Sequence, residues 1–85
     1  METRVAVISA IVEDRDAVEQ LNAVLHEYGD HIIGRMGLPY REKGIHIVSV
    51  AVDAPQDVIA ALSGKIGRIE HIHVKTAYSG VIGHD

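Results

Sequence analysis

Apolar and polar positions divide the chain into four segments that predict strands and two segments with helical spacing. The strands are expected at residues 5–12, 32–38, 45–52 and 72–78. In the first and third segments both alternating sets of positions are mostly apolar or small. A strand with one solvated face would alternate with polar residues, so this pattern predicts strands that are covered on both faces.

The two helices are expected after the first and third strands. Asp14 suits an N-cap, the apolar positions after it recur at helical spacing, and Gly29 is placed to end the first helix. Pro55 suits the first position of the second helix. Its buried stripe is expected to consist of Val58, Ile59, Leu62 and Ile66.

The order of these elements predicts an α+β fold. It is a ferredoxin-like β-α-β-β-α-β sandwich, a four-stranded antiparallel sheet with two helices on one face. The 85 residues allow one domain, and residues 79–85 are expected to fray. An apolar sheet face without helices indicates an interface, so we expect a homo-oligomer, a dimer or tetramer, that associates through this face.

Composition narrows the classes of partner. The net charge of −4 argues against direct binding of nucleic acid through a basic surface. No apolar run approaches the roughly 20 residues that cross a bilayer, so no membrane association is expected. The first residues lack the pattern of a signal peptide, and the chain has no cysteine; a cytoplasmic location is the default expectation.

Four stretches, 12–15, 25–30, 33–44 and 61–67, resemble a family of small stand-alone domains named as regulators of the iron-only hydrogenase system. Residues 34–44, which begin Gly-Arg-Met-Gly-Leu-Pro-Tyr, are the most specific part. The resemblance implies an ACT-like fold and a relationship to the ligand-sensing C-terminal domain of the nickel-responsive repressor. The repressor's nickel ligands are not implied, because the chain has no cysteine and lacks the His-x-His pair on its second strand.

The segment 34–44 is the first candidate for a ligand site. Arg35 and Arg41 could hold a carboxylate or phosphate, with Tyr40 beside them. Gly34 and Gly37 would give a ligand access to the backbone. The same residues equally fit an edge hairpin with solvated charges and bulges.

The turn after the first helix, Gly29 and Asp30, is a second candidate, since the resemblance implies that this turn lines an effector site. A helix C-cap followed by an Asp turn explains the same two residues.

A weaker pattern is His71-Ile72-His73, which would place two imidazoles on one face of a strand and could hold a transition metal. A polar start to an edge strand is the simpler interpretation. No catalytic motif or cofactor motif is recognisable, so the chain is predicted not to be an enzyme. We therefore expect a regulatory module that binds a small effector or a partner protein. The alternatives are a histidine-based metal sensor and a purely structural oligomerising domain.

Overall fold

The computed structural model describes residues 2–84, and the side chains of residues 2–80. Its elements are β1 (Glu2–Val12), α1 (Arg15–Glu27), β2 (Ile32–Tyr40), β3 (Ile45–Ala54), α2 (Gln56–Gly67) and β4 (Ile72–His84). Two 3₁₀ turns, η1 (Gly29–His31) and η2 (Arg41–Lys43), precede and follow β2. The predicted α+β fold is confirmed.

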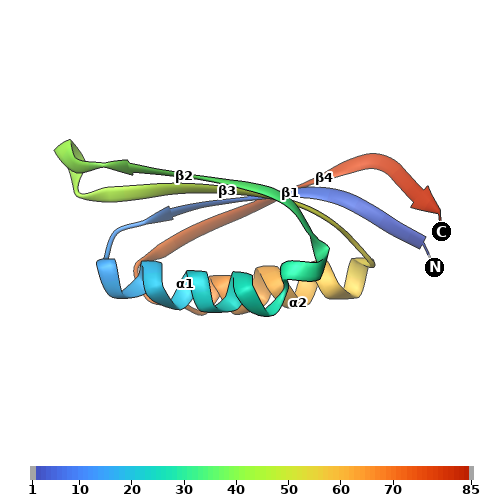
Figure 1. Cartoon of the computed structure of the whole chain (residues 1–85), viewed down its shortest axis with the longest axis horizontal. Coiled ribbons are helices and arrows are strands. Elements are labelled where there is room, and N and C mark those ends of the chain that lie inside the picture. Colours follow the sequence, from blue (N-terminus) through green and yellow to red (C-terminus); the bar gives the residue numbers. More distant parts are fainter. Residues whose placement is uncertain (1, 85) are drawn as a thin grey trace.

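The four strands form one antiparallel sheet in the order β2-β3-β1-β4. Both helices lie on the same face of this sheet, and the other face carries no helix (Figure 1). Each helix returns the chain across the sheet, so the hairpin of β2 and β3 lies beside β1 at one edge and β4 lies at the other.

Alternation along the central strands separates two faces. Ala6, Ile8, Ala10 and Val12 of β1 are buried toward the helices, and the corresponding residues of β3 lie beside them. The helices complete the core with Ala17, Leu21, Leu25, Ile59, Leu62 and Ile66. No buried side chain among the described residues is polar or charged, so burial of aliphatic surface stabilises this layer.

The start of α1 follows the sequence prediction. Asp14 has extended backbone, and its carboxylate accepts a hydrogen bond from the Asp16 N–H at 3.2 Å. Pro55 serves as the N-cap of α2 rather than as its first helical residue. The two helices are joined by an ion pair of 2.9 Å between Lys65 Nζ and Glu27 Oε1. The hydrogen bonds that the Lys65 ammonium group donates to Glu27 and to Tyr28 raise the pKa of Lys65.

The terminal strands are longer than predicted. Residues 79–84, expected as a frayed tail, belong to β4, which continues to His84. β4 extends this far because β1 begins at Glu2, so the first residues of β1 can pair with the last residues of β4. Glu2 is opposite His84 and Arg4 is opposite Ile82, with an irregular register between Arg4 and Ala6. Asp85 lies outside the described residues.

The tip of the β2–β3 hairpin depends on Gly44, which ends η2 with a φ of 65°. A Cβ at this position would meet no atom within 4 Å, so the only cost of an alanine here would come from its left-handed backbone conformation. We expect Gly44→Ala to lower the free energy of unfolding by about 1 kcal/mol, measured by urea denaturation. Gly29→Ala is the matched control, because Gly29 also has open space but an ordinary φ. Equal effects of the two substitutions would contradict this explanation.

Candidate functional site

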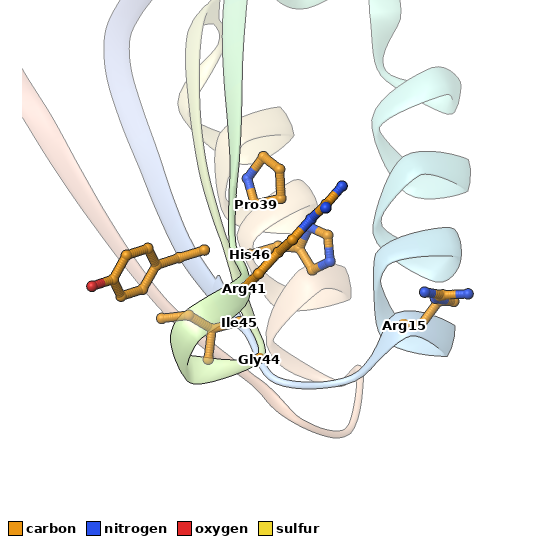
Figure 2. Close-up of a pocket in the computed structure, with 7 residues that line it drawn as sticks. Arg15, Pro39, Arg41, Gly44, Ile45 and His46 are labelled. Atoms are coloured by element: carbon orange, nitrogen blue, oxygen red, sulfur yellow. The ribbon is translucent and has the colours of Figure 1, made fainter.

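The tip of the hairpin projects past the end of the helix layer (Figure 1). Beside it lies an open hollow of about 510 Å³, between η2 and the start of α1 (Figure 2). The hollow is lined by Arg15, Pro39, Tyr40, Arg41, Gly44, Ile45 and His46. Two predicted candidates, Tyr40 and Arg41, therefore lie together at this site.

Strand register decides which side of the hairpin each lining residue faces. Pro39 is opposite His46, and His46 is also opposite Val12, which is buried toward the helices. Tyr40 and Ile45 form the next pair and face the helix-free side. In Figure 2, Ile45 leaves the hairpin on the side away from Arg15. The hollow thus opens toward the helices, while its rim reaches the helix-free face.

The charge at the hollow is positive. No hydrogen bond or ion pair joins the side chain of Arg15 or Arg41 to another described residue, and Figure 2 shows Arg41 extending toward α1. Nearby acidic groups are engaged elsewhere. Glu42 accepts a hydrogen bond of 2.9 Å from the Tyr40 hydroxyl, and Glu13 Oε1 lies 2.6 Å from His73 Nε2. Two guanidinium groups are therefore free to bind an anion.

Arg35 lies apart from this hollow. It is opposite Val50 on the helix side, and its Nη2 donates a hydrogen bond of 2.6 Å to Asn22 Oδ1 of α1. Gly37 shares that side, while Gly34 lies on the helix-free side. A Cβ on either glycine would meet nothing within 4 Å, so the packing of the described residues does not require glycine at these positions.

The other predicted candidates are also separate. Gly29 and Asp30 form η1, which precedes β2, whereas the hollow follows β2 at the opposite end of the strand. Sequence reasoning did not select Arg15 or His46 for this site. The predicted hairpin could have indicated both residues. A turn at residues 41–44 pairs position 39 with position 46, and it places the hairpin tip near the end of β1, which Arg15 follows.

The two histidines near β4 are placed differently from the prediction. His71 lies in the turn before β4 with a φ of 67°, so only His73 is a strand residue. His73 contacts Glu13, whose N–H donates to the His71 carbonyl at 2.9 Å. Among the described side chains, no three potential ligands of the His, Cys, Asp or Glu type are grouped for a metal. Metal binding by His71 and His73 stays a prediction.

The helix-free face carries large apolar side chains. Ile11 is 44% exposed, Leu38 52% and Met36 56%, and Val7 and Tyr40 are exposed on the same face. At its centre Ser9 is paired with Ser49. This is the face that the sequence predicts to be covered. No helix in the described part of the chain is long and apolar enough to cross a membrane.

Comparison with known proteins gives one family. Residues 4–76 match the model of the TM1266-like family, whose description is "Iron-only hydrogenase system regulator, putative". The solved structure of the uncharacterized protein TM1266 from Thermotoga maritima is 38% identical, with a TM-score of 0.86, and the match covers 89% of this chain and 96% of that one. No curated protein matches.

A more distant structure shares only the fold. A formyltetrahydrofolate deformylase from Pseudomonas putida KT2440 is 14% identical, with a TM-score of 0.62, over 86% of this chain and 28% of the deformylase. The family description names a regulatory role and no enzymatic activity. The extent of the family match and the identity to the Thermotoga maritima protein show that the chain belongs to the TM1266-like family of iron-only hydrogenase system regulators.

Proposed function

We propose that this regulator is a homo-oligomer, built through the helix-free sheet face, that binds a small effector or a partner protein beside the interface. It acts as an ACT-like binding module and not as an enzyme. The observation that carries the proposal is the exposure of large aliphatic side chains on a sheet face that has no helix to cover it. A small domain normally buries such a surface in an interface.

The size of the face supports a second copy of the chain as the occupant. The principal extents of the domain are 42 × 19 × 17 Å, and the view down the shortest axis shows the sheet and the helices as two layers seen edge-on (Figure 1). The face spans the longest and shortest axes, and the product of these two extents, on the order of 700 Å², is an upper bound for its flat area. A standard protein interface buries about 800 Å² on each partner, which is close to this area.

The position of the hollow supports a link between binding and assembly. Tyr40 and Ile45 line the hollow and also belong to the helix-free face. A second copy on that face would lie against the rim of the hollow. A ligand that contacts the rim would then bind the assembled and separated forms with different affinity, which is the requirement for regulation through assembly.

The sites predicted around Arg35 and Gly29 are kept as a second location. The lining of the hollow does not include Gly29, Asp30, Gly34, Arg35 or Gly37. Substituting Arg35 and Arg41 separately by alanine distinguishes the two locations. The cytoplasmic location stays a prediction.

Native mass spectrometry of the gently purified protein tests the proposal. We expect a dimer or tetramer, with additional mass from a retained ligand. An assembly without additional mass would favour the purely structural alternative, and the mass of a transition metal would favour the metal sensor. A monomer at micromolar concentration would contradict the interface, because an apolar face of this size should associate.

A further inference from the structure

We propose that the effector is a small anion, a carboxylate or phosphate compound, bound in the hollow by the guanidinium groups of Arg15 and Arg41. This inference rests on the proposed function, since it names the chemical class of the effector. Arginine presents a planar fork of N–H donors that matches carboxylate and phosphate oxygens. Arg15 comes from α1 and Arg41 from η2, so a ligand between them would join two separate elements.

The charge distribution favours an anion at this place. The protein as a whole carries a net charge of −4, which by itself disfavours the binding of anions. At this end, however, Arg15, Arg41 and Lys43 lie within or beside one hollow. The lining of the hollow contains two guanidinium groups and no carboxylate, so it favours an anion.

The acidic side chains nearest in sequence form no ion pair with these arginines. Glu42 is held by the Tyr40 hydroxyl, Glu13 by His73, and Asp14 by the first turn of α1. Asp16 is exposed on that same turn, with no ion pair to Arg15. The contrast is Lys65, which has a carboxylate partner at 2.9 Å in Glu27. The positive charge of Lys65 is therefore paired within the chain, whereas the guanidinium groups of Arg15 and Arg41 have no such partner among the described residues.

The rest of the hollow is suited to a bound anion of modest size. The positive end of the α1 dipole lies at the same end of the molecule and adds to the attraction. His46 contributes an imidazole that has no hydrogen bond to any described residue, and Pro39 contributes an apolar wall. A volume of about 510 Å³ lies within the range of sites for small metabolites.

The test is to titrate a small anion into the full chain at low salt and to monitor binding by NMR or calorimetry. The two probes are inorganic phosphate and succinate, which separate the phosphate source of the ligand from the carboxylate source. We expect saturable binding of at least one probe, with one site per chain. Arg15→Gln and Arg41→Gln should each weaken it about tenfold or more, because each removes a charge-assisted contact.

Arg68→Gln is the matched control. It makes the same change of charge at the C-cap of α2, outside the lining of the hollow, and should leave binding unchanged. Light scattering on the same samples reports the oligomeric state independently. Failure of both probes to bind, or equal losses in all three variants, would overturn the anion site even if the assembly persists. A monomer that still binds a probe through both arginines would overturn the interface and leave the anion site standing.

Discussion

Ile11→Lys is expected to separate the oligomer into monomers while the domain stays folded. Ile11 lies on the helix-free face of β1, between Ile47 of β3 and His73 of β4, and is 44% exposed in the single chain. A lysine there can extend into solvent from a monomer. In the assembly the same ammonium group would be buried against apolar side chains without a partner.

The expected size of this effect follows from the cost of burying an unpaired charge. That cost is several kcal/mol per ion, and a two-fold symmetric interface would contain the substituted residue twice. The dissociation constant should rise by at least about a hundredfold, since each 1.4 kcal/mol corresponds to a factor of ten. Sedimentation velocity over a range of protein concentrations measures it.

Ala60→Lys provides the control for added charge. Ala60 is exposed on α2, in the helix layer, and the substitution changes the net charge by the same amount. The assembly should survive it. If Ile11→Lys sediments as the wild-type protein does, the helix-free face is not the interface.

The fold was predictable because its signals are local and repeated. Asp14 marks the start of α1 by a side chain that caps its own helix, and the apolar stripe that contains Leu21 and Leu25 fixes the buried face. The extension of β4 beyond Tyr78 was not predictable in this way. Gly80 and Gly83 weaken the local strand pattern, and the pairing depends on the first residues of β1, which are far away in sequence.

The candidate site was only partly predictable for a similar reason. Tyr40 and Arg41 could be proposed because they lie in one distinctive segment with Arg35. Sequence proximity does not decide which side of the sheet a residue occupies or what it contacts. The hydrogen bond from Arg35 to Asn22 and the arrival of Arg15 beside the hairpin tip are both products of tertiary structure.

Leu21→Ala, a truncation in the buried core, is expected to cause a large loss of stability. Leu21 is 1% exposed and packs from α1 into the layer between the helices and the sheet. Truncating a buried leucine costs about 2–5 kcal/mol, because transfer free energy is lost and a cavity remains. With 85 residues, no disulfide and a total stability of about 5–15 kcal/mol, the protein has little reserve.

Thermal unfolding, followed by circular dichroism, should show this loss as a fall in the melting temperature of about 10 °C or more. Leu38→Ala makes the same truncation on the helix-free face, where Leu38 is 52% exposed in the single chain. Its effect should be small at concentrations where the chain is monomeric and larger where the chain is assembled, because only then is Leu38 buried. Leu21→Ala should destabilise both forms. If the loss of stability caused by Leu38→Ala does not depend on protein concentration, Leu38 is not buried by a second copy. If Leu21→Ala lowers the free energy of unfolding by less than about 1 kcal/mol, the close packing inferred between α1 and the sheet is wrong.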